Sequence, residues 1–370
     1  MNNFTIFDLM PEDEAIKHRP IKSNDWKWTM KDDYPKEKNG LKVFSCFACG
    51  GGSTMGYKLA GCEVIGCCEI DPKMNEVYIK NHHPKHNFLM DIRDFNKIPN
   101  DELPEELFDL DILDGSPPCT TFSMSGERED SWGKKKKFRE GQAEQTLDDL
   151  SFVFIETVAK LKPKVVIMEN VEGLIKGEAW SYVQKIYAQL HETGYKVKHW
   201  LLKGEHMGVP QKRHRVFFVA LRNDDGYDID NLDMCFNYMP ITYGEIKSGI
   251  IKASPNIVEL LGLCKHKEKD LVKAWNRKNN PGNKEKRMYF NHIVTFDDDV
   301  VQTITGDHNN MFDFSEKAKI SDRSVANAST FPQDYDYCGK RIPYICGMSV
   351  PPIMIKRIVT RLIDSGIFER

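Results

Sequence analysis

Short apolar runs alternate with helical patterns between residues 41 and 222, and this alternation constrains the fold more than any other feature. Strands are expected at Leu41–Phe47, Cys62–Cys68, Leu110–Leu113, Val165–Met168 and Val216–Leu221. The last two runs are almost continuously apolar, as central parallel strands buried on both faces are. Strands of this kind, separated by helices, predict an α/β fold with a doubly wound sheet.

Helices are predicted between these strands by capping residues and by apolar residues at three- and four-residue steps. Ser53–Ala60 follows a glycine turn, and Asp71-Pro72 supplies an N-cap and a first-turn proline for a helix that ends near residue 80. An apolar stripe predicts a long helix over Ala143–Leu161. A last helix is predicted over Pro351–Ile363, started by Ser349 and two prolines.

The composition excludes several classes of protein. Hydrophobic residues make up 40% of the chain and charged residues 29%, with a net charge of −3, which excludes a disordered tail or a histone-like chain. No apolar run reaches the roughly 18–20 residues of a membrane helix, and the N-terminus lacks a signal-peptide stretch. The ten cysteines are more typical of reduced thiols than of a disulfide framework. We therefore expect a cytoplasmic protein without membrane contact.

Two cysteines, Cys46 and Cys49, form a C-x-x-C pair. No second pair follows at zinc-finger spacing, so no metal site is predicted.

The character of the chain changes after Arg222. Residues 245–290 contain eleven Lys or Arg against five Asp or Glu, interspersed with Trp275, Tyr289 and Phe290. This composition is equally typical of a solvated, irregular small domain and of a surface that binds phosphates.

A glycine-rich turn lies between the first predicted strand and the first helix, at Phe47–Gly56, and Glu69 closes the second strand. Such a turn lets a ligand approach the backbone, and the acid can accept hydrogen bonds from ribose hydroxyls. The pattern suits an adenosine-containing cofactor, but it does not separate a dinucleotide from S-adenosylmethionine. A tight turn without a ligand is the alternative.

Three further motifs lie next to predicted strands. Pro117-Pro118-Cys119 places a thiol on a stiff loop, where a nucleophile or an inert core cysteine is expected. Glu169-Asn170-Val171 places an acid at the end of a buried strand, suited to proton chemistry or to helix capping. Gln211, Arg213 and Arg215 share one face of an extended segment. They suit phosphate and base recognition, or a solvated strand edge.

Together and in this order, the motifs resemble the DNA cytosine-C5 methyltransferase family of bacterial or phage type. The matching segments are Phe47–Gly51, Glu69, Asp91-Ile92, Pro117–Cys119, Glu169–Val171, Gln211–Arg215, Arg323, Phe331-Pro332 and Gly347–Pro352. The resemblance spans residues 41–365, except most of 223–300. Three positions depart from the family pattern: Cys49 replaces a glycine, Ser329 a glutamine and Met348 an asparagine.

The resemblance implies a doubly wound mixed sheet, the Rossmann-like fold of S-adenosylmethionine-dependent methyltransferases, with a smaller target-recognition domain inserted. It divides the chain into an N-terminal extension (1–40), a catalytic and cofactor-binding domain (41–222), a target-recognition domain (223–315) and a return segment (316–370). The partner it implies is double-stranded DNA. We expect a monomer, with a cognate restriction endonuclease, where one exists, as a separate protein.

The resemblance also implies roles for individual residues. Cys119 would attack C6 of a flipped-out cytosine, Glu169 would hold a proton at N3, and Arg213 and Arg215 would bind the cytosine O2 and phosphates. The implied S-adenosylmethionine contacts are Phe47, Gly51, Glu69, Ile70, Asp91, Ile92, Pro118 and Ser349. The implied DNA contacts are Gln211 and three residues of a loop over 123–142, namely Ser123, Arg128 and Lys134.

Three other functions remain open at this point. A tRNA cytosine-C5 methyltransferase would share the chemistry and many motifs, and a catalytically silent DNA-binding relative would share the fold. An NAD-dependent oxidoreductase would explain the glycine turn but not Pro-Pro-Cys or Glu-Asn-Val.

Overall fold

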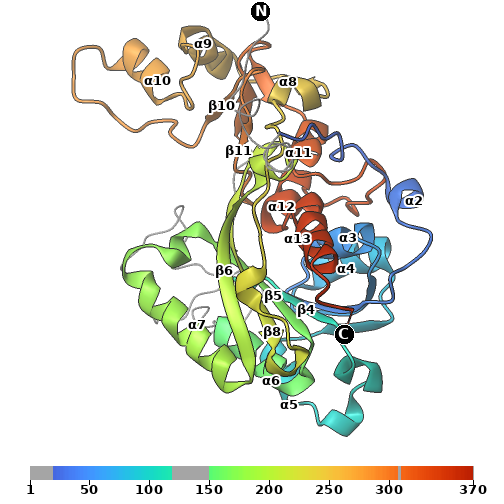
Figure 1. Cartoon of the computed structure of the whole chain (residues 1–370). Coiled ribbons are helices and arrows are strands. Elements are labelled where there is room, and N and C mark those ends of the chain that lie inside the picture. Colours follow the sequence, from blue (N-terminus) through green and yellow to red (C-terminus); the bar gives the residue numbers. More distant parts are fainter. Residues whose placement is uncertain (1–19, 119–149, 307–309, 370) are drawn as a thin grey trace, which may run out of the picture.

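The computed structural model describes residues 20–118, 150–306 and 310–369 (Figure 1). Its largest element is a seven-stranded sheet in the order β3-β2-β1-β4-β5-β8-β6. The strands are β1 (Lys42–Cys46), β2 (Glu63–Glu69), β3 (His86–Leu89), β4 (Ile112–Gly115), β5 (Val165–Val171), β6 (Tyr195–Lys203) and β8 (His214–Arg222). The predicted strands are therefore confirmed to within a few residues.

The sheet is mixed because one strand runs against its neighbours. From β3 to β5 every neighbouring pair is parallel, whereas β8 is antiparallel to both β5 and β6. The expectation that Val216–Leu221 is a parallel strand was wrong. Its continuous apolar run reports burial on both faces, which an antiparallel strand in the middle of a covered sheet also has.

Helices cover both faces of the sheet, as a doubly wound fold requires. Side chains alternate along each strand, so Val43, Ile167 and Phe217 enter one core and Phe44, Val166 and Phe218 the other. The first face carries α3 (Gly52–Leu59), α4 (Pro72–His82) and α13 (Pro352–Asp364) (Figure 1). The opposite face carries α5 (Ile92–Lys97), α6 (Leu150–Leu161) and α7 (Trp180–Glu192). The predicted residues 143–149 of the long helix lie outside the described residues.

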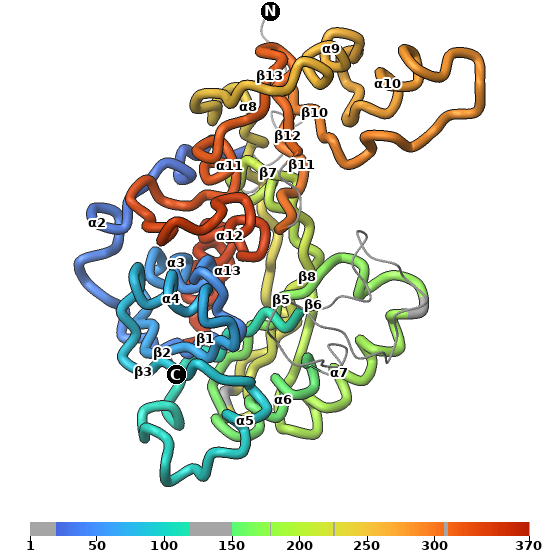
Figure 2. Tube along the Cα trace, turned by 180° about the vertical axis from the view of Figure 1, so that it is seen from behind, coloured from blue at the N-terminus to red at the C-terminus, as the bar shows by residue number. Residues whose placement is uncertain are grey.

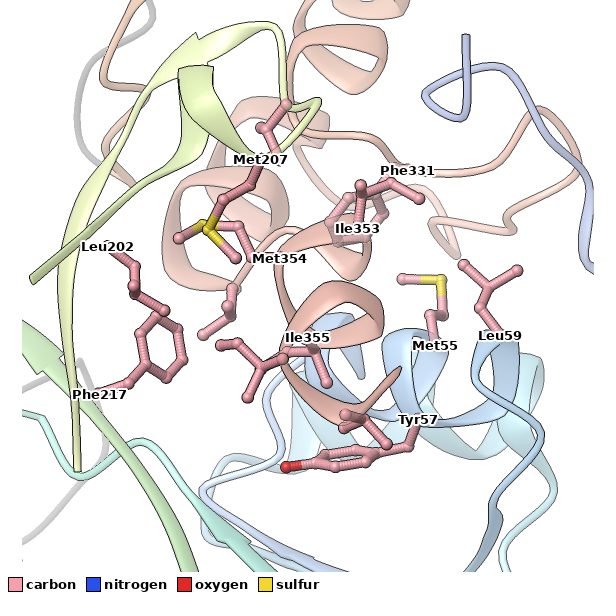
Figure 3. Close-up of a cluster of buried hydrophobic side chains, with 14 of the residues drawn as sticks. Met55, Tyr57, Leu59, Leu202, Met207, Phe217, Phe331, Ile353, Met354 and Ile355 are labelled. Atoms are coloured by element: carbon pink, nitrogen blue, oxygen red, sulfur yellow. The ribbon is translucent and has the colours of Figure 1, made fainter. Parts of the chain in front are cut away.

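The C-terminal helix α13 packs closely on α3. A Cβ atom on Gly56 of α3 would lie 2.5 Å from both the Ile355 Cβ and the Pro352 carbonyl oxygen, so only glycine fits there. Met354 and Ile355 of α13 fill the core between α3 and the sheet residue Phe217 (Figure 3). The C-terminal helix α13 and the early helix α3 thus lie side by side in the helical layer on this face of the sheet.

A smaller unit stands at one end of the molecule, and we call residues 243–320 the small domain (Figure 2). Its sheet has the order β10-β12-β13-β9, and its own apolar core lies under its helices. The elements are α8 (Tyr243–Ile246), β9 (Ile250–Ile251), α9 (Pro255–Leu263), α10 (Val272–Asn279), β10 (Ile293–Thr295), β12 (Met311–Asp313) and β13 (Ala318–Ile320). The chain then returns through α11 (Asp322–Ala328) and α12 (Ile342–Met348).

A two-stranded parallel ladder joins the small domain to the large sheet. Strand β11 (Val301–Gln302) pairs with β7 (Gln211–Lys212), which leads directly into β8. The small domain is therefore hydrogen-bonded to the segment from which β8 begins.

Residues 20–40, which include α2 (Met30–Asp33), lie across the return segment. The Trp28 indole is buried and donates a 2.8 Å hydrogen bond to the Thr330 carbonyl oxygen. Backbone N–H groups of Met30 and Lys31 bind the Asp334 carboxylate at 2.8 and 3.1 Å. This part of the N-terminal extension thus fastens the return segment in place.

No helix among the described residues is long and apolar enough to cross a membrane.

Candidate active site

The predicted functional side chains gather at one edge of the large sheet. The carboxyl ends of parallel strands meet at the same edge, which is where open α/β sheets bind ligands. Strand β8 is antiparallel and therefore begins at this edge. The residues placed there are Phe47 after β1, Glu69 at the end of β2, Asp91 after β3, Pro118 after β4, Glu169 in β5 and Arg215 in β8.

Glu169 and its neighbour Asn170 connect three of the sequence motifs. The Glu169 carboxylate is 9% exposed and forms an ion pair with Arg215, with 2.8 Å between Oε1 and Nε. Asn170 Nδ2 donates a 3.4 Å hydrogen bond to the carbonyl oxygen of Pro117, two residues before Cys119. An acid, a guanidinium and the backbone leading to the thiol are thereby held at one place.

Gln211 and Arg213 lie in the interior, where they hold the chain together. Gln211 is fully buried; its Oε1 accepts from the Ile304 N–H at 3.1 Å, and its Nε2 donates to the Ser329 hydroxyl at 3.3 Å. Arg213 donates to the carbonyl oxygens of Ile304 and Gly347 at 3.1 and 3.2 Å. Burial lowers the pKa of Arg213 to about 9.

Two expectations concern these residues: that Gln211 contacts DNA, and that Arg213 binds the cytosine O2 and phosphates. In the described residues the Gln211 amide and the Arg213 guanidinium both bind protein groups. Their roles toward DNA and the cytosine stay predictions. Alternation predicted that the three side chains share a face, but it did not show that the first two are covered by the return segment.

The glycine turn is built around the Glu69 carboxylate. Oε2 accepts from the Cys49 N–H at 2.7 Å and Oε1 from the Asp71 N–H at 2.8 Å. Cys49 has φ +49° and Phe47 has φ +56°, left-handed conformations that cost a non-glycine residue about 1–2 kcal/mol. The hydrogen bond from Cys49 to Glu69 helps to hold this conformation at the position where the family pattern has glycine.

His82 packs behind the turn and explains Gly51. Gly51 has φ +80°, and a Cβ atom there would lie 2.1 Å from His82 Nε2. Burial lowers the pKa of His82 to about 3, so the ring is neutral. Its Nε2 lies 3.3 Å from the Gly50 carbonyl oxygen, which also accepts from the Tyr335 hydroxyl. Sequence reasoning missed both His82 and Tyr335 because they are distant in the chain from the turn.

The groups around the turn fit S-adenosylmethionine. A carboxylate can accept several hydrogen bonds, and the Glu69 carboxylate at the end of β2 is an acceptor of the kind that ribose hydroxyls require. Ile70 exposes 36% of its surface beside it, suited to an apolar contact with adenine. The Ser349 hydroxyl is 3% exposed and has no hydrogen-bond partner among the described residues, as a group awaiting a ligand would.

The other expected cofactor contacts have protein partners of their own. Asp91 caps α5 by accepting from the Arg93 N–H at 2.8 Å. Ile92 is 4% exposed and belongs to the core under α5 and α6. Pro118 is half-buried, and the Phe47 ring lies 6.4 Å from that of Phe154.

Four predicted site residues lie outside the described residues: Cys119, Ser123, Arg128 and Lys134.

Ser329 and Met348, the two remaining departures from the family pattern, lie within the described part. Ser329 is buried and accepts the hydrogen bond from Gln211. Met348 packs on Gly306, where a Cβ atom would lie 2.8 Å from the Met348 sulfur.

Asp114 is a buried acid at this edge to which the sequence analysis gave no role. It lies in β4, is 2% exposed, and accepts hydrogen bonds from the Ser45 hydroxyl at 2.7 Å and the Tyr57 hydroxyl at 3.0 Å. Burial raises the pKa of Asp114 to about 7, although both hydroxyls oppose the rise. The sequence could have predicted a buried acid here, because Asp114 directly follows the apolar run of a predicted strand.

A profile of the C-5 cytosine-specific DNA methylase family matches residues 41–364. The chain belongs to this family. The predicted family is confirmed, and with it the class of enzyme, a DNA cytosine-5 methyltransferase.

Individual relatives of the methylase are bacterial and phage enzymes. It is 25% identical to Type II methyltransferase M1.HphI of Haemophilus parahaemolyticus over 349 residues, which cover 89% of this chain and 88% of the relative. It is 31% identical to M.FnuDI of Fusobacterium nucleatum over 184 residues, 50% of this chain and 48% of the relative. The methylase thus spans about half the length of this second relative.

Solved structures support the fold. A protein described as a prophage-encoded DNA modification methyltransferase of E. coli matches 88% of this chain and 99% of its own, with a TM-score of 0.64 and 18% identity. Spodoptera frugiperda DNMT2, in a mutant form, matches 88% of this chain and 100% of its own, with a TM-score of 0.61 and 15% identity. The mixed α/β methyltransferase fold is therefore confirmed.

The raised pKa of Asp114 predicts a pH-dependent stability. The folded protein binds this proton more tightly than the unfolded chain, in which the pKa is near 3.8, so the fold loses stability as pH rises from about 3.8 to about 7 and loses no more above that. Asp114→Asn cannot ionise. Measured by urea unfolding, its stability relative to wild type should improve by about 2–3 kcal/mol between pH 5 and pH 8.

Asp109→Asn is the matched control. Lys42 pairs with Asp109 at 2.7 Å and lowers its pKa, so this carboxylate stays ionised throughout that pH range. Its stability relative to wild type should be the same at both pH values. If the difference in unfolding free energy between Asp114→Asn and wild type were also the same at pH 5 and pH 8, Asp114 would not have the raised pKa.

Proposed function

We propose that this methylase transfers a methyl group from S-adenosylmethionine to C5 of a flipped-out cytosine in a specific duplex DNA sequence. The transfer would pass through a covalent bond between Cys119 and C6. The observation that carries the proposal is the meeting of three motifs at one sheet edge. Glu169 pairs with Arg215, and the adjacent Asn170 holds the Pro117 carbonyl.

The chemistry that we assign to the protein begins with the Cys119 thiolate, which adds to C6 of the cytosine. Glu169 holds a proton at N3 and neutralises the charge that develops on the ring. Arg215, already paired with Glu169, orients this carboxyl group and binds the cytosine O2. C5 is then nucleophilic, and after methylation a water-derived base removes the C5 proton so that the thiolate is expelled and recovered.

The cofactor supplies the methyl group when bound, and the residues around the glycine turn would hold it. Glu69 would accept hydrogen bonds from the ribose hydroxyls, and Ile70 would contact the adenine. The Ser349 hydroxyl would bind a polar group of the methionine portion. Phe47 and Asp91 flank this space at the ends of their strands.

Duplex DNA is the substrate that the family favours, and the charge distribution suits the phosphates of a nucleic acid. The excess of positive charge in residues 245–290 lies in the small domain, which stands beside the reaction edge, and phosphate neutralisation is the main source of affinity for DNA. The target base must leave the stack, at a cost of roughly a few kcal/mol that protein contacts offset.

We place this activity in the cytoplasm of a prokaryotic or phage-infected cell, performed by a monomer.

Transfer of labelled methyl groups to duplex DNA, compared with tRNA, tests the proposal. We expect incorporation into DNA, and a loss of roughly 10²-fold or more in Glu169→Gln because the proton at N3 is no longer held. Glu156→Gln, on the exposed side of α6, should retain the wild-type rate. Incorporation into tRNA alone would instead support the RNA enzyme.

Calorimetric titration tests the assigned cofactor separately. Glu69→Gln should weaken S-adenosylmethionine binding by roughly tenfold or more, because hydrogen bonds to a charged acceptor contribute about 1.5–3 kcal/mol. Glu63→Gln, at the exposed start of the same strand, serves as the control and should bind as wild type does. No heat from wild-type protein at millimolar cofactor would rule this cofactor out.

A further inference from the structure

A pocket lies where the small domain meets the β11–β7 ladder, away from the cofactor turn. The side chains that matter for its chemistry are Lys269, Phe290, Asn291, Gln302, Thr303 and Thr305. They come from the segment before α10, the segment before β10, and the end of β11 with the residues that follow it. No part of the reaction chemistry described above uses them.

The pocket combines an exposed aromatic ring with free amide groups. Phe290 is 50% exposed, and the Arg287 guanidinium lies 5.1 Å from its ring centroid. The side-chain amides of Asn291 and Gln302 have no hydrogen-bond partner within the described part of the chain. An apolar face beside unused donors and acceptors is what a nucleobase edge requires.

Among the described residues that line the pocket, Asp270 is the one acid, and it already has a hydrogen-bond partner. Asp270 accepts a 2.9 Å hydrogen bond from the Val272 N–H at the start of α10. The two amides are therefore the groups best placed to read a base. Lys269 is exposed beside them and supplies a positive charge for a phosphate.

The floor of the pocket is fixed to the reaction edge. Ile304 lies between Thr303 and Thr305, and its N–H and carbonyl oxygen bind Gln211 and Arg213, both at 3.1 Å. The Thr303 hydroxyl donates to the Lys212 carbonyl oxygen at 2.5 Å. Since Arg215 follows in the same segment and pairs with Glu169, an occupant of the pocket is held in register with the reacting base.

We propose that this pocket reads an adenine–thymine base pair next to the target cytosine and so sets part of the recognition sequence. Asn291 and Gln302 bind adenine N6 and N7, the pairing that an amide makes in the major groove. Phe290 packs against the thymine methyl group, and Lys269 binds a backbone phosphate. This inference rests on the proposed function, and it adds the identity of the residues that choose the DNA site.

The test uses full-length protein and a library of duplex DNA in which the positions around one cytosine vary. Bisulfite sequencing after a limited reaction gives the relative rate for each neighbouring base pair. Wild type should prefer A·T at a position adjoining the methylated cytosine. The double variant Asn291→Ala/Gln302→Ala should reduce that preference about tenfold to a hundredfold, the discrimination expected of one bidentate contact to adenine.

Ratios of rates separate recognition from folding. A variant that is only partly folded lowers the rate on all sequences equally and leaves the preference intact, which would overturn the inference. Asn279→Ala is the matched control, since Asn279 is exposed on α10 and donates to the Trp275 carbonyl oxygen of its own helix. Its sequence preference should equal that of wild type.

Two results from wild type alone are also decisive. A methylated motif with G·C or no preference at every adjoining position overturns this inference while leaving the proposed function intact. An enzyme that methylates no member of the library overturns the proposed function as well.

Discussion

The buried guanidinium of Arg213 holds together the parts of the chain on which the site depends. It donates to the carbonyl oxygens of Ile304, which follows β11 in the small domain, and Gly347, at the end of α12. Removing this charge from water is costly, as its pKa of about 9 shows. Gln211 adds its own hydrogen bonds to the same two regions, so the cost is offset by contacts that no apolar side chain could make.

This junction gives the reaction edge its geometry. Strand β8 begins immediately after Arg213 and carries Arg215 to the Glu169 carboxylate. The same junction fixes residues 302–305, which floor the pocket of the small domain. In the function we propose, recognition and chemistry are joined by one short segment, and binding energy at the pocket would position the reacting base. At the glycine turn, His82 and Tyr335 contact the Gly50 carbonyl oxygen. These contacts help to hold the positive φ angles of the turn.

The sequence predicted the large sheet well because its strands are apolar runs separated by capped helices. The direction of β8 was not predictable, since burial on both faces leaves the same pattern in either direction. Strands β9–β13 have only two or three residues each, too few for a periodic signal. Motif spacing identified Glu169 and Arg215, whose contact follows from neighbouring strands. It could not show that Gln211 and Arg213 are covered, because the covering residues lie about a hundred positions later in the chain.

The central claim is that a thiol attacks the pyrimidine ring at this edge, and trapping the adduct tests it most directly. Duplex DNA carrying 5-fluorocytosine at the recognised position has no C5 proton to lose, so the enzyme should remain attached after methylation. The account predicts a denaturation-resistant complex with wild-type protein and cofactor, with the DNA-linked peptide containing Cys119, and none with Cys119→Ser. A wild-type enzyme that methylates ordinary DNA but leaves no adduct, or an adduct that persists in Cys119→Ser, would contradict it.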